Sequence, residues 1–477
     1  MNSIIKHYKI IGLSSLVFAV STAISAFTLD DIPEIKNKTP INVALEAGGS
    51  ADTIIPFLEA FSKKTGVPIT HEAMVFATLY SKENIELQSG TGAYDVVVTE
   101  TSWTNEWKDY LAPLEDLANK YDPVGAEGFK KYVSGQDAGI LRMASTRDGS
   151  LVGAPYYTYT QQNIYRKDLL TDAGEMSAFK SKYGYDLSAP TTQQQLLDIA
   201  EFFTRKAGDK LKGETLDKPF YGVSLMAGRY PHVQDEVSAI LWGSGGRWAR
   251  TNRDSNGKVV SFEITDDDAN KLEEAFAYYQ KLMKFAPPGS ENAFWDFATA
   301  QFVEGNTAMI PYMYCPLWNW SSDVEKVGGM NAAAAVVGER PYTGAFHFAP
   351  SVDSKNLEAA YWLLKYIGSK ETQTEMVNKG WSSARKDSLD ACDRNAENAH
   401  RNCGWIDSVA SQWEAQAPEI ETYLHFNSGA FGKLYEQMTI IAHENAVGIK
   451  SPSESVKAWK KAFNRFQKKF DDVKVIN

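Results

Sequence analysis

The residues best suited to do chemistry in this sequence are aromatic rings that stand where expected strands end or where the chain crosses between lobes. Rings flanked by polar and charged groups suit carbohydrates, because C–H faces pack on rings while hydroxyls form directed hydrogen bonds to carboxylate, amide and guanidinium groups. The alternative interpretation of any single ring is that it packs in a hydrophobic core. The set as a whole predicts a ring-lined cleft and comprises Trp103, Tyr156, Tyr157, Tyr159, Trp242, Tyr314, Trp318, Trp320 and Trp381.

Signatures of catalysis and of cofactor binding are missing from the sequence. It contains no HExxH, no GxSxG in a strand-turn-helix setting, no GxxxxGK followed by Ser or Thr, and no GxGxxG opening a helix. The seven histidines are scattered, so no zinc-binding spacing is present. Carboxylate pairs occur in any chain with 60 acidic residues, which leaves a glycosidase or lyase open but without positive support. The residues alone therefore nominate no catalytic residue and no cofactor.

One pattern matches a calcium-binding loop by spacing. It consists of Asn252, Asp254, Asn256, Gly257 and Glu263, with Asn in place of the usual first Asp. The segment that follows Gly257 alternates like a strand, and no helix precedes the loop. A solvated hairpin turn is the favoured interpretation, and we expect no metal site.

The composition bounds the class of protein. The chain has 477 residues, of which 43% are apolar and 12% aromatic, and this length predicts two globular domains. The formal net charge is −11, and it becomes more negative once Lys6 and Lys9 are removed with the N-terminal segment described next. This charge argues against nucleic acid or an anionic lipid surface as a partner.

The N-terminus has the pattern of a secretory signal peptide over residues 1–26. Lys6 and Lys9 precede an apolar run at 10–20, and a small-residue stretch ends at Ala26. The run is too short for a comfortable membrane span, and no later stretch reaches about 18 consecutive apolar residues. We expect cleavage near Ala26 and a soluble periplasmic protein.

Three cysteines occur in the chain. Cys392 and Cys403 bracket a polar segment, and in an oxidising compartment a disulfide between them is favoured over two free thiols. Cys315 lies in an aromatic run without a neighbouring base, so we expect it to be unpaired and buried.

The elements that position the rings begin with alternating strands and helices. Residues 41–46 predict a buried strand, after which Ser50 or Asp52 can cap a helix that ends at Gly66. Strands near 67–69 and 94–98 enclose a second helix. This order predicts a parallel sheet with helices on both faces, whose ligands lie at the carboxyl ends of the strands. The residues at those ends are Glu46, Gly48, Gly49, Glu100, Thr101, Ser102 and Trp103.

The stretch 151–170 marks the first crossing between lobes. Its Gly-Ala-Pro break at 153–155 indicates a taut strand, because proline fixes its own φ and disfavours helix at the preceding residue. Tyr156, Tyr157 and Tyr159 should then alternate around the strand, with at least one ring facing a cleft.

A second set of elements follows the first crossing. Helices are expected from Thr191 or Thr192, from His232, over 266–284 and over 294–302, with a strand at 221–225. Extended aromatic segments at 306–314 and 344–350 predict the second and third crossings, followed by helices, the cysteine loop and an all-helical tail. We expect lobe 1 to contain 27–152 and 312–346, lobe 2 to contain 153–311 and 347–440, and a C-terminal helical segment over 441–477.

Five segments in order resemble one known family over nearly the whole mature chain. The segments are INVALEAGG with FLEAFSKKTGVPI, GTGAYDVVVTE with YLAPLEDL, LVGAPYYTYTQQNIYRKDLLTDAG, FVEGNTAMIPYMYCPLWNW and SKNLEAAYWLLKYIGSKETQTEMVNKG. They are similar to segments of the extracellular solute-binding proteins of family 1. These are the sugar-binding components of bacterial ABC importers, of which maltose-binding protein is the best-known member.

The resemblance implies an α/β, two-lobe, periplasmic-binding-protein-like (type II) fold. Each lobe would be a mixed, mostly parallel sheet flanked by helices, with three interlobe crossings and a helical C-terminal tail. Trp318 falls near the family's ring in a Gly-Pro-Trp segment, and Arg229 and Trp242 match a binding stretch loosely. The expected ligand-binding residues are Gly48, Glu100, Trp103, Tyr156, Tyr157, Tyr159, Arg229, Trp242, Tyr314, Trp318, Gly344, Trp381 and Arg385.

The implied function is capture of a sugar, sugar alcohol or short oligosaccharide in the cleft, closure by hinge rotation, and delivery to the permease subunits of an ABC importer. We expect a monomer without chemical turnover. One alternative is a periplasmic carbohydrate-active enzyme. Another keeps the fold but binds a polyamine-like cation, against which Arg229 and Arg385 in the cleft would argue.

Overall fold

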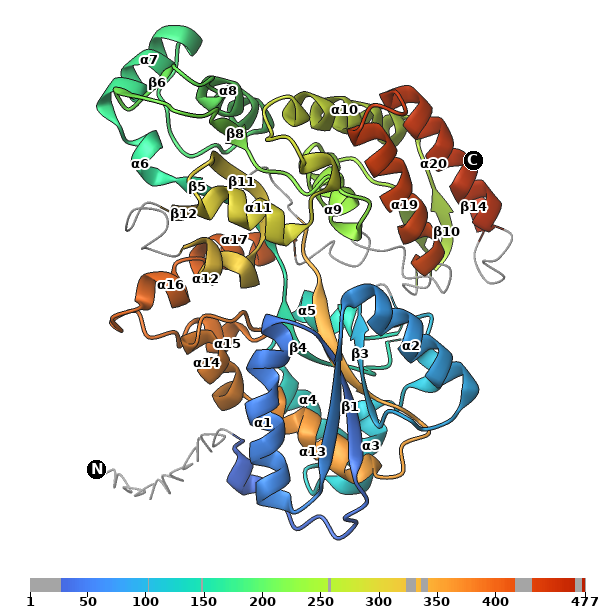
Figure 1. Cartoon of the computed structure of the whole chain (residues 1–477). Coiled ribbons are helices and arrows are strands. Elements are labelled where there is room, and N and C mark those ends of the chain that lie inside the picture. Colours follow the sequence, from blue (N-terminus) through green and yellow to red (C-terminus); the bar gives the residue numbers. More distant parts are fainter. Residues whose placement is uncertain are drawn as a thin grey trace, which may run out of the picture.

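Two sheets, each covered by helices, form two lobes joined by a narrow waist (Figure 1). The computed structural model describes residues 27–101, 103–146, 149–255, 259–322, 332–335, 342–416, 431–467 and 474–476. The expected signal peptide at 1–26 lies outside these residues. Within them, no helix is both long enough and apolar enough to cross a bilayer.

The sheet of the first lobe has the strand order β2-β1-β3-β13-β4. Strand β1 pairs in parallel with β2 and β3, whereas β13 is antiparallel to both β3 and β4. The bounds are β1 Ile41–Glu46, β2 Ile69–Met74, β3 Val96–Glu100, β4 Ala154–Thr158 and β13 Ala345–Pro350. The helices are η1 Leu29–Asp31, α1 Gly49–Thr65, α2 Phe76–Ser89, η2 Lys108–Tyr110, α3 Leu114–Tyr121, α4 Gly125–Val133, α5 Ala138–Met143 and α13 Leu357–Ile367.

Helix α1 shows how the sequence sets local structure in this lobe. It follows Gly48, whose φ of 100° favours glycine, and it ends at Gly66, which adopts the left-handed conformation with φ 70° and whose N–H donates to the carbonyl of Ser62. Its apolar face, including Ile54 and Phe61, is buried. The predicted βαβ unit is confirmed, and its parallel pairing brings the ends of β1 and β3 to one edge of the sheet.

The sheet of the second lobe has the strand order β12-β5-β11-β8. Strand β5 is antiparallel to β12 and β11, and β11 is parallel to β8. The bounds are β5 Gln161–Arg166, β8 Tyr221–Val223, β11 Thr307–Tyr314 and β12 Ala332–Ala335, with a short hairpin of β6 Lys210–Leu211 and β7 Glu214–Thr215. The helices before β12 are α6 Lys167–Leu170, α7 Ala173–Tyr183, α8 Gln193–Phe203, α9 Pro231–Gly243, α10 Asp266–Met283, η3 Ser290–Asn292, α11 Trp295–Val303, η4 Cys315–Leu317 and α12 Trp318–Ser321.

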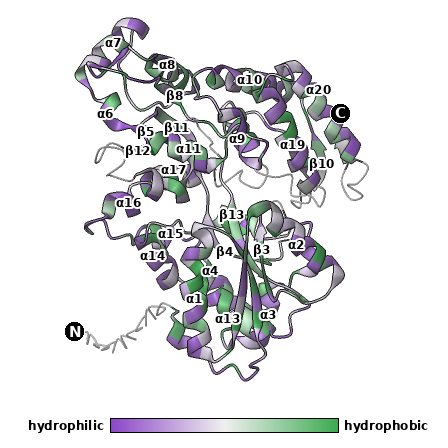
Figure 2. Cartoon of the chain, in the orientation of Figure 1, coloured by the Kyte–Doolittle hydropathy of each residue, from purple (hydrophilic) through white to green (hydrophobic). Residues whose placement is uncertain are grey.

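Each lobe has its own hydrophobic core. The first is built around Val96, Val97 and Val98 of β3, all fully buried, and the second around residues such as Ile310 of β11 and Phe276 of α10. Figure 2 shows the hydrophobic residues on the strands and on helix faces turned toward them. Both sheets are mixed, and antiparallel strand pairs are more frequent than the mostly parallel sheets that were expected. The antiparallel pairs involve β4, β5 and β13, the strands next to the first two crossings.

The chain crosses between the lobes three times, as expected. The first crossing follows β4 at 159–160, within the expected stretch 151–170, and the second precedes β13 at 343–344, at the start of the expected segment 344–350. The third follows α14 Lys370–Asn378, where no crossing was expected. Residues 312–322 therefore lie in the second lobe, although they were expected in lobe 1. Strand β4, residues 347–350 of β13 and helix α13 lie in the first lobe, although they were expected in lobe 2. The segment 306–314 was expected to cross because it is extended and aromatic. It instead forms strand β11, which pairs with β5 and β8 within one sheet.

The C-terminal part also differs from the expected all-helical tail. After α15 Lys386–Leu389, α16 Ala399–Cys403, α17 Ile406–Gln416, α19 Phe431–Ala446 and α20 Pro452–Gln467, the chain ends in strand β14 Lys474–Ile476. Strand β14 is parallel to β10 Val259–Glu263, which is antiparallel to β9 Arg250–Arg253. Helices α19 and α20 pack on α9 and α10, so the expected separate segment is part of the second lobe.

The segment with calcium-loop spacing forms part of this antiparallel strand pair. Asn252 lies on β9, and its side-chain amide donates to Ser261 Oγ at 3.0 Å and to Glu263 Oε2 at 3.3 Å. Asn256 and Gly257 lie outside the described residues. In the parts of the chain that are described, no group of three or more His, Cys, Asp or Glu is arranged to hold a metal ion.

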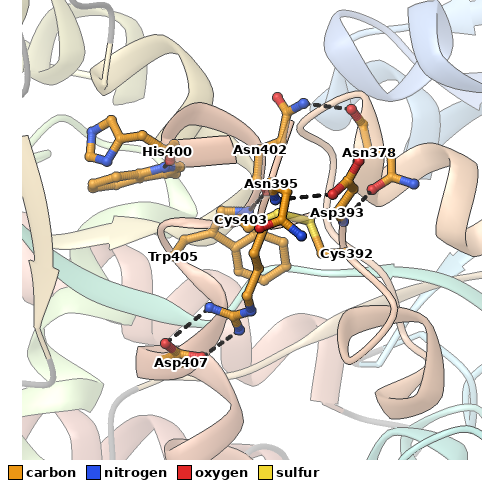
Figure 3. The surroundings of a disulfide bond; sticks show 11 residues. Asn378, Cys392, Asp393, Asn395, His400, Asn402, Cys403, Trp405 and Asp407 are labelled. Atoms are coloured by element: carbon orange, nitrogen blue, oxygen red, sulfur yellow. Dashed lines mark hydrogen bonds and ion pairs between the residues drawn. A yellow bond between two sulfur atoms is a disulfide. The ribbon is translucent and has the colours of Figure 1, made fainter. Parts of the chain in front are cut away.

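The predicted disulfide joins Cys392 and Cys403, and it closes a loop next to the third crossing (Figure 3). The loop is tied to the end of α14: the backbone N–H of Asp393 donates to Asn378 Oδ1 at 3.0 Å, and the side chain of Asn402 donates to the carbonyl of Asn378. Cys315 is free and buried, as expected, and burial raises its thiol pKa to about 12.

The disulfide predicts a measurable loss of stability on removal. The bridged residues are 11 apart, for which the loop-entropy model gives roughly 2 to 3 kcal/mol. The double variant Cys392→Ser with Cys403→Ser should lower the free energy of unfolding in urea by that amount at unchanged m-value. Adding reductant should destabilise the native protein to the same level and leave the double variant unaffected. Equal stability of both proteins would contradict a structural role for the bridge.

Candidate ligand-binding site

A cavity of about 130 Å³ lies between the lobes, and both lobes line it. The first lobe contributes the ends of β1 and β3, the start of α1, the first crossing and the loop after α14. The second lobe contributes the start of α9, α11, the run after β11, and α19. The lining residues are Glu46, Ala47, Gly49, Ser50, Phe76, Glu100, Tyr157, Tyr159, Pro231, His232, Asp235, Phe294, Trp295, Tyr314, Pro316, Leu317, Trp320, Phe346, Trp381 and Tyr435.

Three carboxylates reach the cavity, and a tyrosine hydroxyl donates to each. Tyr157 donates to Glu46 at the end of β1, and Tyr159 donates to Glu100 at the end of β3. Parallel pairing of β1 with β3 places these two acids at the same sheet edge. The third, Asp235 of α9, accepts from the hydroxyls of Tyr314 and Tyr435 and from the side-chain amide of Gln234.

Burial holds protons on two of these acids, Glu46 and Asp235, more tightly than water would. Burial raises the pKa of Glu46 to about 7; the hydrogen bond from Tyr157 opposes this shift, and the charge of Glu100 adds to it. Burial likewise raises the pKa of Asp235 to about 8, against the hydrogen bond from Tyr314 and with the charge of Glu100. The cavity thus contains carboxyl groups that exchange protons near neutral pH.

Aromatic rings form walls on both sides of the carboxylates. In the first lobe, Tyr157 stacks on Phe346 with centroids 5.0 Å apart and meets Trp381 edge-on at 5.3 Å. In the second lobe, Trp295 lies 5.3 Å from Trp320, whose side chain is 43% exposed. These rings offer apolar faces to a ligand held between the lobes.

Two glycines allow the rings to approach the backbone. A Cβ at Gly49 would lie 2.7 Å from the ring of Trp381, and one at Gly344 would lie 2.1 Å from the ring of Tyr159. Any side chain at Gly49 would push Trp381 away from the start of α1. Gly344 was expected to contact ligand; in the structure it makes room for Tyr159 at the second crossing.

The start of α9 brings a histidine to the cavity beside Asp235. Pro231 occupies the first helical turn, and His232 packs against Phe294 with centroids 4.3 Å apart. Burial lowers the pKa of His232 to about 3, so its imidazole is neutral at physiological pH. Its Nδ1 has no hydrogen-bond partner in the structure. A neutral imidazole here can exchange hydrogen bonds with a polar ligand.

Of the expected ligand-binding residues, the structure brings five together around the cavity. They come from both lobes and from two of the crossings, and they are Glu100, Tyr157, Tyr159, Tyr314 and Trp381. Tyr156 lies behind them: it is fully buried, its hydroxyl is 3.1 Å from Ser50 Oγ, and its ring stacks on Phe348. Gly48 is exposed just before the cavity-lining Gly49 and does not line the cavity.

Three expected tryptophans lie in the cores instead of the cavity. Trp103, only 3% exposed, packs among aromatic rings of the first core; Trp242 stacks on Tyr342, and Trp318 packs on His400 in the second core. Trp320 reaches the cavity in place of Trp318. Two positions along a helix differ by about 200° in direction, so only one of these two rings can face the ligand side.

The two expected arginines also lie away from the cavity lining. Arg229 is exposed, in the loop before α9. Arg385 is 5% exposed, pairs with Asp387 at 2.8 Å, and donates to the carbonyls of Tyr132 and Gly368. These hydrogen bonds hold the chain near the third crossing to the first lobe. The guanidinium group is therefore used by the protein itself and not by a ligand.

Several lining residues were not predicted. Asp235 is the most informative, because it stands beside Glu236 inside a helix whose other residues are mostly apolar, and paired acids on a buried helix are a visible signal. Glu236 lies behind the cavity, where burial raises its pKa to about 8 and Tyr279 donates to it. Ser50, Phe76, Phe294, Trp295 and Tyr435 carry no such signal, since isolated residues of these types are ordinary in helices and loops.

The fold and the cavity together define a two-lobe binding protein of the type II periplasmic class, in which a solute site lies between sheet-based lobes joined by three crossings. The chain belongs to the bacterial extracellular solute-binding proteins, since that family's model matches residues 47–374. The fold class expected from the sequence is therefore confirmed. Among curated proteins, none matches this sequence significantly.

Solved structures with the same fold are distant in sequence. An ABC transporter solute-binding protein from Agrobacterium radiobacter K84 in complex with ribitol has 19% identity and a TM-score of 0.69, over 90% of this chain and 99% of that chain. One from Agrobacterium vitis S4 with bound D-mannitol has 18% identity and a TM-score of 0.67, over 90% and 99%. Maltose-bound MalE3 of T. maritima has 17% identity and a TM-score of 0.65, over 90% and 100%.

The buried acid on α9 predicts a pH dependence of stability. The pKa of Asp235 is about 8 in the folded protein, well above its unfolded value of about 4, so the folded state binds more protons between these pH values. Its contribution to stability is therefore present at low pH and is lost as pH rises toward 8. Relative to the native protein, Asp235→Asn should gain stability with rising pH, by at most about 1.4 kcal/mol per pH unit.

Urea unfolding of both proteins at pH 5, 6, 7 and 8 measures this difference. Asp267→Asn is the matched control, because that side chain is 63% exposed on the surface of α10. A stability difference between Asp235→Asn and native protein that stays constant over this range would contradict a protonated Asp235.

Proposed function

We propose that this protein is the periplasmic solute-binding component of an ABC importer, and that its solute is a sugar or sugar alcohol held between the lobes. The observation that carries the ligand class is the pairing, in one cavity, of aromatic walls with hydroxyl–carboxyl pairs. Membership of the solute-binding family supports the transport role.

The chemistry of the lining suits a polyhydroxylated ligand. Each tyrosine–carboxyl pair presents oxygens that can accept from a solute hydroxyl, and a tyrosine hydroxyl can also donate. Tyr157, Trp381 and Trp320 offer apolar faces against which C–H groups pack. Polar groups then fix the orientation while rings contribute burial.

The size of the cavity favours a small solute. Its 130 Å³ is of the order of a cavity that holds a single small molecule, about 150 Å³. Among carbohydrates, a monosaccharide or a five- or six-carbon polyol is therefore closer to this volume than a long oligosaccharide. Ribitol and D-mannitol, bound in two structures of the same fold, are polyols of five and six carbons.

Capture is coupled to hinge closure in this proposal. Tyr157 and Trp381 belong to the first lobe, whereas Asp235 and Trp320 belong to the second, so a solute that contacts both sets favours the closed arrangement. The ligand shifts this equilibrium only by its differential affinity for the closed form. Residues 159–160 and 343–344 are the segments about which the lobes would turn.

Location and partners follow from the same proposal. Residues 1–26 would direct export and be removed near Ala26, and the closed monomer would dock on the permease subunits. Chemical turnover forms no part of this role. Incubation with a panel of oligosaccharides should yield no new reducing ends, whereas product formation at catalytic ratios would favour the carbohydrate-active enzyme.

A thermal-shift screen over pentitols, hexitols, monosaccharides, maltose and longer maltodextrins tests the ligand class. A true ligand at about 100 times its Kd should stabilise the folded protein by about 2.7 kcal/mol, which raises the melting temperature by several degrees. We expect the strongest shift from a five- or six-carbon compound. A shift produced only by oligosaccharides would contradict the proposed size, and none from any carbohydrate or polyol would contradict the ligand class.

Removing a wall ring should weaken binding without unfolding the protein. Trp381 is half-buried and lines the cavity, so Trp381→Ala should reduce affinity for the best polyol from the screen by roughly 10- to 100-fold, the loss expected for one stacked ring of about 1 to 3 kcal/mol. The matched control is Tyr183→Ala, on the remote helix α7 (Figure 1). Titration calorimetry measures both, and equal affinities would contradict the assigned site.

A further inference from the structure

The cavity has an unbalanced charge. Glu46, Glu100 and Asp235 all line it, whereas none of the described residues that line it is a lysine or arginine. The basic residues expected there, Arg229 and Arg385, lie elsewhere, and His232 is neutral because burial lowers its pKa to about 3. The acids also act on one another, since the charge of Glu100 raises the pKa of both Glu46 and Asp235.

Carboxyl groups can accept from neutral hydroxyls, but three of them without a cation among the described lining residues carry a desolvation cost that a cationic solute would offset. Glu100 is 1% exposed and Asp235 is 4% exposed, so their charges are largely removed from water. Neutral sugars and polyols can be bound by amide and hydroxyl groups, which carry no such desolvation penalty. Tyr157 and Trp381 also form aromatic walls. The faces of their rings carry partial negative charge, which attracts a cation more strongly than a neutral hydroxyl group.

We propose that the solute carries a protonated amine beside its hydroxyl groups, as an amino polyol or amino sugar does, and that Glu46, Glu100 and Asp235 bind the ammonium group. This inference rests on the proposed function and narrows its ligand class. The ammonium donates to the carboxylates, the hydroxyls exchange hydrogen bonds with Tyr159, Tyr314 and His232, and the carbon chain packs on the rings. The aromatic and hydroxylic lining distinguishes this ligand from a bare polyamine.

The proposal has a consequence for protons. Burial raises the pKa of Glu46 to about 7 and of Asp235 to about 8, so the empty site holds protons near neutral pH. An ammonium group favours the ionised carboxyls and releases those protons on binding. Affinity for the amine should therefore rise from pH 6 to pH 8, whereas affinity for the matching neutral polyol should change little. The titratable groups that act on these acids from the packed elements include, besides the acids themselves, Tyr156, Tyr157, Tyr159, His232, Glu236, Tyr314, Tyr342 and Tyr435.

Matched pairs of compounds provide the test with the full mature protein. The probes are 1-amino-1-deoxy-D-sorbitol against D-sorbitol, D-glucosamine against D-glucose, and spermidine as a cation without hydroxyls. Titration calorimetry at pH 6, 7 and 8, in two buffers with different heats of ionisation, gives both affinity and proton release. We expect 1-amino-1-deoxy-D-sorbitol at pH 8, or D-glucosamine at pH 7, where its more acidic ammonium is still protonated, to bind 10-fold or more tightly than its neutral partner. Binding should release protons, and the affinity of 1-amino-1-deoxy-D-sorbitol should rise with pH.

Variants locate the effect. Glu46→Gln should reduce the preference for the amine over its neutral partner by at least several-fold and lower proton release, while circular dichroism and melting temperature confirm folding. The surface variant Asp267→Asn should keep both the preference for the amine and the proton release.

The outcomes separate this inference from the proposed function. Binding of D-sorbitol or D-glucose as tightly as the amine would overturn the inference and leave the proposed function intact. Binding of spermidine alone would overturn both the sugar or polyol function and the amino polyol. No response to any of these probes, together with a positive response to another neutral sugar in the thermal-shift screen, would overturn the inference alone.

Discussion

The structure depends on keeping three carboxyl groups, the buried Glu100 and Asp235 and the half-buried Glu46, at one place between two lobes. Parallel pairing within the first sheet places Glu46 and Glu100 at the same edge, and helix α9 brings Asp235 from the other lobe. Tyrosine hydroxyls donate to all three. Without these hydrogen bonds the acids would be unsatisfied in a low-dielectric site, which costs several times more than a typical hydrogen bond contributes. The tyrosines therefore both line the site and make it possible.

The crossings decide how the two halves of this arrangement meet. Tyr157 lies on the last strand before the first crossing, and Tyr159 lies within it. Gly344 in the second crossing leaves room for the ring of Tyr159, and Trp381 follows the last helix before the third. Two of the tyrosines that line the cavity are thus located at or next to a segment that connects the lobes. A change in lobe orientation must alter the geometry of the cavity, which is the physical basis for coupling capture to closure.

The disulfide and Arg385 stabilise the third crossing from outside the site. Cys392 and Cys403 close a loop that hydrogen-bonds to the end of α14, and Arg385 joins the chain to the carbonyls of Tyr132 and Gly368. In sequence, Trp381 lies between Asn378, to which the loop is hydrogen-bonded, and Arg385. A ring held at the edge of a cavity by fixed neighbours loses less entropy on binding than a mobile one.

Sequence by itself determined the class of protein, because strand and helix periodicity, a Gly-Ala-Pro break and ordered family-like segments are local signals. It also gave the disulfide and five cavity residues, which stand at strand ends and crossings where topology exposes side chains. Only the tertiary structure decided that Trp320 and not Trp318 faces the cavity, that β11 joins the second sheet, and that Asp235 completes the acidic group. The reason is that helix rotation, strand partners and the facing of remote elements depend on packing between distant segments, which no local pattern specifies.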